Sequence, residues 1–173
     1  PASDIKIDDD WHTYGLAGTG SKTIICDDVF VPEHRLVSFA DAISKTAAGL
    51  DGHANPLFRA PYLAVFPTML AAAGVGAAQG AVASFIDQVK VRETRGAVAG
   101  GKLKMASFGT IQLRIAEADA AASTADLILT TSLRRVEEMT AKGHVMTKEE
   151  RIICRREQAY AVGRVAVELA VAG

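Results

Sequence analysis

An uncharged stretch of 27 residues, at positions 60–86, constrains this chain more than any other feature. The stretch is long enough to span a membrane. However, it is dominated by alanine and glycine, it contains Pro61, Pro67 and Gln79, and no aromatic or basic belt borders it. Alanine-rich segments enter lipid far less favourably than leucine-rich ones. We therefore predict a helix buried on most of its sides in a bundle, rather than a membrane span.

The composition is that of one ordinary globular domain. Of 173 residues, 49% are hydrophobic and 23% are charged, with a net charge of -1. The chain therefore has no overall excess of basic residues, which a protein that binds nucleic acid usually has. Cys26 and Cys154 are too few for a disulfide framework and fit a reducing compartment as two buried thiols. With no secretory signal in view, we predict a cytoplasmic protein that binds neither nucleic acid nor membrane.

The first part of the chain has the patterns of strands and turns. Ile5 and Ile7 alternate with polar residues, as in a half-buried strand. Residues 23–26 and 29–31 are β-branched and aromatic, which favours further strands before Pro32. Small and polar residues at 44–58 predict a connection.

Three long helices are expected after that connection. The first is predicted to start at Pro61 or Pro67 and to end near Thr94, and residues 95–104 form a glycine-containing loop. The second is predicted at about 107–141. Its spacing predicts a core face made of Leu113, Ala116, Ala120, Ser123, Leu127 and Thr130, widened by Ile111, Ile115, Ala118, Ala122 and Ile128.

The third helix is predicted from local signals at the preceding corner. Gly143 is suited to end the second helix. Thr147 and Glu150 have the spacing of a capping box, so the third helix should start near Lys148 and run to the end of the chain. Three antiparallel helices with short loops suggest an up-down four-helix bundle whose last helix is missing. Because both ends also look cut, we expect a fragment of a longer protein.

The glycines of the loop at 11–21 do not have the spacing of a standard phosphate loop. Gly15, Gly18 and Gly20 give GxxGxG, whereas a dinucleotide fingerprint is GxGxxG between a strand and a helix. A Walker A loop also opens a helix, and here a strand pattern follows. A turn between two strands is therefore favoured on spacing alone.

Other chemical motifs are weak. His12, His34, His53 and His144 have no histidine or cysteine partner at metal-ligand spacing, so we expect no metal. There is no GxSxG motif, and Ser21 has no partner in the sequence to activate it. Arg92 and Arg95 follow the first helix, where cations favour the helix dipole. A phosphate grip is the alternative function for these arginines, and the residues alone favour capping.

Together, these segments resemble the acyl-CoA dehydrogenase superfamily. The stretch WHTYGLAGTGSKTIICDDVFVPEHRL is similar to the segment that leads out of its middle β-domain. LAAAGVGAAQGA resembles its first C-terminal helix, and RETRG lies where the family has Arg-x-x-Phe-Gly. The resemblance covers nearly the whole chain in the right order, and its first motif is fairly specific.

Within that superfamily, the chain is most similar to flavin-dependent aromatic monooxygenases. Ala17 replaces the arginine of the dehydrogenase motif, and residues 63–67 lack the early glutamate of one dehydrogenase subgroup. PASDI, GTGSK and VPEHR, together with an Ala-Gly-Gly-Lys turn, resemble oxygenase components of two-component hydroxylases. Such enzymes act on 4-hydroxyphenylacetate or on the phenolic ring of steroid catabolites.

The resemblance implies a mainly α fold with a small β part. Residues 1–43 would end a β-barrel-like middle domain, 44–60 would connect, and 61–173 would form the helical bundle without its last helix. A separate reductase would supply reduced FMN or FAD, and a C4a-hydroperoxyflavin would hydroxylate a phenolic substrate. The subunits would form a homotetramer with the bundles at its core.

The resemblance also implies roles for particular residues. Arg92 or Arg95 would reach a flavin phosphate, across a subunit interface, and Thr19 and Ser21 are secondary candidates for flavin contacts. The catalytic histidine and serine of the family are expected outside these residues and cannot be named. Two alternatives stay open: an FAD-dependent acyl-CoA dehydrogenase and a non-enzymatic helical oligomerisation module.

Overall fold

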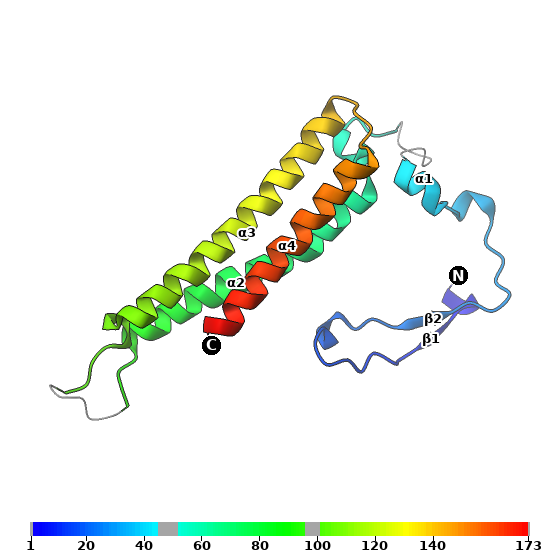
Figure 1. Ribbon diagram of the computed structural model, residues 1–173. Coiled ribbons are helices and arrows are strands. Elements are labelled where there is room, and N and C mark those ends of the chain that lie inside the picture. Colours follow the sequence, from blue (N-terminus) through cyan, green and yellow to red (C-terminus); the bar gives the residue numbers. More distant parts are fainter. Residues whose placement is uncertain (1, 45–51, 96–100, 173) are drawn as a thin grey trace. The chain divides into compact units, whose positions relative to one another are not determined.

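The computed structural model describes residues 2–44, 52–95 and 101–172 (Figure 1). The chain divides into two compact units, Pro1–Val37 and Ser38–Gly173. Each unit has its own regular structure, and the two are described separately below. The assignment of residues 1–43 to the end of a β-domain and of 44–60 to a connection stays a prediction.

The first unit is built on a two-stranded antiparallel sheet. Strand β1 (Lys6–Asp8) pairs with β2 (Thr23–Ile25), and Ile7 lies opposite Ile24. The loop at 11–21 is therefore a turn between two strands, as its spacing predicts. Short 3-10 turns at Ala2–Asp4, Ala17–Thr19 and Glu33–Arg35 complete the unit.

Two predictions about this unit are wrong. No strand forms at 29–31 among the described residues, since β2 ends at Ile25 and Asp28 takes a positive φ of 48°. Cys26, just past the strand, is exposed rather than buried. Only Cys154 lies in a core, where burial raises the pKa of its thiol.

The second unit contains the three predicted long helices. These are α2 (Tyr62–Val91), α3 (Gly109–Ala141) and α4 (Lys148–Ala172), and each packs against the other two (Figure 1). Shorter elements precede them or join them: α1 (Phe39–Ser44), η5 (Pro56–Arg59) and η6 (Met105–Ser107). Helix α2 starts after Pro61 and continues through Pro67.

The core between the three helices is made mainly of alanine. Its main cluster consists of Ala71, Val75, Ala78, Ala122, Ala125, Leu129, Ala161 and Val165. Small side chains allow helix axes to approach at the short end of their usual distance. A second cluster joins Ala64, Val136, Met146 and Cys154 near the α3–α4 corner.

Enlargement of the alanine core should destabilise the bundle. Ala78 is fully buried, so Ala78→Leu has no room and should lower the free energy of unfolding by about 1–3 kcal/mol. Ala77→Leu, at the exposed neighbouring position of α2, is the matched control and should change stability by less than about 0.5 kcal/mol. Urea denaturation measures both, and equal effects would contradict this account of the packing.

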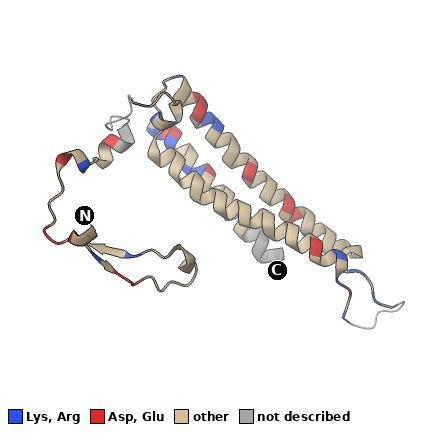
Figure 2. Cartoon of the chain, turned by 180° about the vertical axis from the view of Figure 1, so that it is seen from behind, with Lys and Arg blue, Asp and Glu red and all other residues tan. Residues whose placement is uncertain are grey.

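Helix α2 is less buried than its sequence predicts. It is long and apolar enough to cross a membrane by length and composition, and only 22% of its most apolar window lies buried. Figure 2 shows this stretch of the helix without charged residues. Its buried side chains form one stripe, because α3 and α4 pack against one side: Ala64, Thr68, Ala71, Val75, Ala78, Val82 and Val89.

The predicted core face of α3 is also wrong in part. Leu113 and Leu127 are 59% and 65% exposed, and Ala116, Ala120 and Ser123 are exposed as well. Close packing selects the small side chains of α3 instead. The buried positions are Ala118, Ala121, Ala122, Ala125, Leu129, Ser132, Val136 and Thr140.

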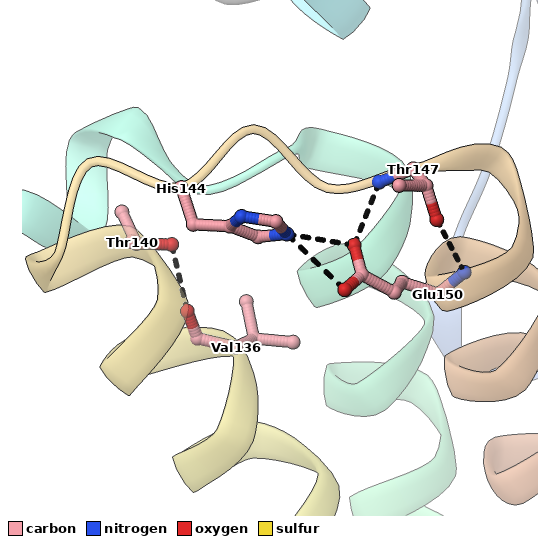
Figure 3. A network of polar contacts seen from close by, with 5 residues as sticks. All are labelled: Val136, Thr140, His144, Thr147 and Glu150. Atoms are coloured by element: carbon pink, nitrogen blue, oxygen red, sulfur yellow. Dashed lines mark hydrogen bonds and ion pairs between the residues drawn. The ribbon is translucent and has the colours of Figure 1, made fainter.

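The corner between α3 and α4 forms as predicted (Figure 3). Gly143 has φ 69°, and the amides of Gly143 and His144 donate to the carbonyls of Thr140 and Met139, which is a Schellman motif. The Glu150 carboxylate accepts from the Thr147 amide at 2.7 Å. In return, the Glu150 amide donates to Thr147 Oγ1 at 3.2 Å, which completes the capping box.

Loss of the cap should be measurable. Thr147→Ala removes the acceptor for the Glu150 amide and should lower the free energy of unfolding by about 1 kcal/mol. Thr131→Ala, at an exposed position inside α3, is the control and should stay within about 0.5 kcal/mol. If both variants unfold at the same urea concentration as the wild type, the cap contributes nothing.

The same corner should make stability depend on pH. His144 Nε2 lies 2.9 Å from the Glu150 carboxylate, and this contact, followed by the Thr147 amide, lowers the pKa of Glu150. A depressed carboxyl pKa adds stability above the pKa of the unfolded chain, and this stability is lost as pH falls through the folded value. Glu150→Gln should therefore weaken the protein at neutral pH and flatten the acid limb of its stability curve. An unchanged acid limb would contradict this role.

Candidate functional site

Arg92 and Arg95 lie where α2 leaves the bundle. Arg92 is the C-cap of α2, and its amide donates to the Gln88 carbonyl at 3.0 Å. The Arg92 carbonyl accepts from the Met105 amide at 2.9 Å, so the chain returns beside it after the loop. A bridge between Glu93 and Lys104 closes this loop at its base. The glycine-rich segment at 96–100 lies outside the described residues.

Both guanidinium groups are exposed at this fixed base. Neither arginine side chain forms an ion pair or hydrogen bond with the residues that the structure describes. The backbone of Thr94 is held as well, since its amide donates to the Leu103 carbonyl at 3.0 Å. The two arginines therefore carry free N–H donors on a backbone that hydrogen bonds hold in place. Phosphate oxygens can accept from such donors.

The side chain of Lys104, rather than that of either arginine, places a cation beside a carbonyl group at the end of α2. The sequence had suggested this role for Arg92 and Arg95. Lys104 Nζ lies 3.5 Å from the Val91 carbonyl at the end of α2 and 3.4 Å from a Glu93 oxygen. The pair was not predicted from the sequence, because Glu93 and Lys104 lie on opposite sides of the loop. The signal available in the sequence was the presence of two oppositely charged residues, Glu93 and Lys104, on the two sides of a glycine-rich loop.

Thr19 and Ser21 lie together in the other unit. Their hydroxyl oxygens are 3.2 Å apart, and Thr19 Oγ1 donates to the Leu16 carbonyl at 2.9 Å. The Trp11 indole N–H donates to the same carbonyl at 3.0 Å. Positive φ angles at Gly15, Leu16 and Gly20 shape the loop. Both hydroxyls are exposed, and the loop is organised by its own backbone and side chains.

A hollow of about 520 Å³ lies between the first turns of α2 and the start of α4. Its apolar lining comes from Leu63, Phe66, Pro67, Leu70 and Ile152, and its cations are Lys148, Arg151 and Arg155. This combination can hold an apolar ring that carries a negative or partly negative oxygen. No cluster of metal-ligating side chains occurs among the residues that the structure describes.

Comparison with known proteins identifies the helical part. The family described as "Acyl-CoA dehydrogenase, C-terminal domain" matches residues 68–172. The chain belongs to this family. The mainly α fold is thereby confirmed, and the relatives described next confirm the resemblance to flavin-dependent oxygenase components.

Two similar proteins are both named as the oxygenase part of a flavin-dependent enzyme. The oxygenase component of an FADH2-dependent resorcinol hydroxylase from Rhizobium sp. is 46% identical over 94% of this chain and 41% of its own length. The oxygenase subunit HsaA of a flavin-dependent monooxygenase from Rhodococcus jostii is 36% identical, over 95% of this chain and 42% of its own.

A solved structure agrees with these relatives. The 3-HSA hydroxylase from Rhodococcus sp. superposes with a TM-score of 0.85 at 34% identity, over 98% of this chain and 43% of that one. The chain therefore spans about two fifths of the length of the proteins that it matches.

Proposed function

We propose that this chain is part of the oxygenase component of a two-component flavin-dependent monooxygenase. The observation that carries the proposal is 46% identity, along nearly the whole chain, to the oxygenase component of a resorcinol hydroxylase. Reduced flavin would supply the chemistry: with O2 it inserts one oxygen atom into a phenolic C–H bond and releases the other as water, while the flavin is oxidised. FADH2 is the proposed form, since the name of that relative specifies it.

The residues of this chain would bind and position the flavin and the substrate, rather than react with them. Arg92 and Arg95 would hold a phosphate of the flavin bound by a neighbouring subunit, because Arg92 lies about 39 Å along α2 from the hollow at Phe66 and both exposed guanidiniums have free donors on a fixed backbone. Thr19 and Ser21 would give secondary contacts. The hollow between α2 and α4 suits the apolar ring and oxygen of a phenol or phenolate, because its described lining combines apolar side chains with three cations.

The proposed partners follow from the same assignment. A separate flavin reductase would deliver the reduced flavin, and the substrate would be a small phenolic aromatic. The protein would act in the cytoplasm as a homotetramer. Met69 of α2 is 68% exposed and lies outside the lining of the hollow, which supports burial of this part of the helix in an assembly.

Turnover with reduced FAD or FMN and a panel of phenols tests the proposal. The expected result is a hydroxylated product in addition to hydrogen peroxide, and flavin binding at micromolar concentration. Dehydrogenation of acyl-CoA substrates would favour the dehydrogenase instead. If no flavin binds and no substrate is converted, both enzymes are rejected and a helical oligomerisation module is favoured.

A further inference from the structure

The hollow between α2 and α4 carries more positive charge than a single phenolate oxygen would neutralise. Lys148, Arg151 and Arg155 line it from α4, and its lining from α2 is apolar. None of these three cations forms an ion pair with a described residue. In the part of the chain that the structure describes, no acidic side chain lines the hollow. A phenolate would therefore leave part of this positive charge uncompensated.

The spacing of the three cations places them on one face of α4. Positions three and four apart are neighbours on the surface of a helix, and Lys148, Arg151 and Arg155 follow this spacing. They span about 10 Å along the helix axis. Arg151 is partly buried and Arg155 is exposed. Like charges at this spacing repel one another, so an anion bound between them is favoured.

The facing wall on α2 is apolar and is held in place. The ring of Phe66 stacks on Tyr62, with ring centroids 5.0 Å apart. In the turn that leads to Pro67, the Ala64 carbonyl accepts from Gln158 Nε2 at 2.8 Å. Gln158 belongs to α4 and is 4% exposed, so this buried hydrogen bond ties the two helices that form the hollow. A wall that is fixed in advance loses little entropy when a ring binds to it.

We propose that Arg151 and Arg155 select a phenol that carries a carboxylate on its ring. The ring would lie against the apolar wall at Phe66 and Pro67. The carboxylate would accept hydrogen bonds from the two guanidinium groups, with Lys148 adding to the positive field. The proposal rests on the oxygenase function proposed above. It adds the substrate class and two residues that determine specificity.

The lining favours this ligand over other anions and over a neutral phenol. The fork of donors in arginine matches the two oxygens of a carboxylate. The volume of about 520 Å³ lies in the range of small-molecule sites. A free phosphate would leave the apolar wall uncovered, and a neutral phenol would leave both arginines unpaired. An aromatic carboxylate satisfies both sides of the hollow.

Calorimetric titration of the intact oxygenase component tests the ligand class. 4-Hydroxybenzoate and 4-hydroxybenzamide have nearly the same shape and differ in charge. Under anaerobic conditions, with and without reduced FAD, the carboxylate should bind at least about tenfold more tightly than the amide, since it gains charge-assisted hydrogen bonds. Equal affinities, tighter binding of the amide, or no binding of either compound in both conditions would overturn the proposal.

Substitution of single cations tests the residues. Arg151→Gln and Arg155→Gln should each weaken the binding of 4-hydroxybenzoate about tenfold and change that of 4-hydroxybenzamide less than about threefold. Arg156→Gln is the matched control, because Arg156 is the next residue on α4 but lines a different hollow. Its effect on both compounds should stay below about threefold. Unchanged affinity in both test variants, or equal losses in all three, would reject the assignment.

Flavin titration and product analysis separate this proposal from the oxygenase function. Arginine-dependent binding of the carboxylate by a protein that binds no flavin would reject the oxygenase and leave the anion site standing. Hydroxylation of phenols without any preference for the carboxylate over the amide would reject the anion site and leave the oxygenase.

Discussion

Gln158→Ala should lower the free energy of unfolding by about 2–4 kcal/mol. Gln158 is 4% exposed on α4, and its Nε2 donates to the Ala64 carbonyl at 2.8 Å and to Thr68 Oγ1 at 2.9 Å. Both partners lie on α2, beside Pro67, which has no amide to donate to the preceding turn. The glutamine therefore ties the proline-containing turn of α2 to α4.

Two further substitutions separate hydrogen bonding from volume. Gln158 Oε1 is buried and accepts no hydrogen bond from the residues that the structure describes. Gln158→Met removes this oxygen together with the two donors and keeps most of the volume, so it should cost only about 1 kcal/mol. Gln158→Glu must bury a carboxylate, whose pKa desolvation raises. Its stability relative to the wild type should therefore improve as pH falls.

Urea denaturation at several pH values measures all three variants. A Gln158→Met variant as unstable as Gln158→Ala would show that the two hydrogen bonds, rather than packing volume, are decisive. Gln88→Ala, at an exposed glutamine near the end of α2, is the control and should stay within about 0.5 kcal/mol. An unaltered Gln158→Ala variant would contradict the role of this residue altogether.

The features that the sequence predicted correctly are those set by neighbours in the chain. Gly143 and the capping box at Thr147 and Glu150 depend on contacts within a few residues, so their spacing is sufficient evidence. The turn at 11–21 follows in the same way from the patterns on each side of it. Local chemistry of this kind is visible before any packing is known.

The errors concern features set by packing. Periodicity places Leu113 and Leu127 on one face of α3, but it cannot say whether that face or the alanine face meets α2 and α4. Cys26 was predicted to be a buried thiol because two cysteines fit a reducing compartment, but β2 ends before it and leaves it exposed. The Glu93–Lys104 bridge joins residues across a loop, so the residues that flank the loop hint at it but spacing alone does not establish the pairing.

The candidate site was predicted by resemblance rather than by spacing. The residues alone favoured a capping role for Arg92 and Arg95, whereas the structure places Lys104 at the end of α2. The flavin role of these arginines stays a prediction, as do the roles of Thr19 and Ser21. A phosphate site needs groups converging from several segments, and a linear pattern gives no distance between them.

Arg92→Ala should weaken the binding of reduced FAD about 10- to 150-fold. One charge-assisted hydrogen bond to a phosphate contributes about 1.5–3 kcal/mol, which corresponds to that range. Arg92 is the better candidate of the two arginines, because hydrogen bonds at 3.0 and 2.9 Å fix its own amide and carbonyl. A fixed backbone reduces the entropy lost when the side chain grips a ligand.

Anaerobic flavin titration measures this effect, with Arg95→Ala examined in parallel. Lys102→Ala removes a cation from the same loop and is the control for general electrostatic attraction, which should cost less than threefold at physiological salt (about 0.6 kcal/mol). Because the guanidinium of Arg92 is exposed, its removal should leave the urea midpoint unchanged. Equal losses of flavin affinity in all three variants would indicate general electrostatic attraction rather than a specific contact. Unchanged affinity in both the Arg92 and the Arg95 variants would reject the phosphate grip.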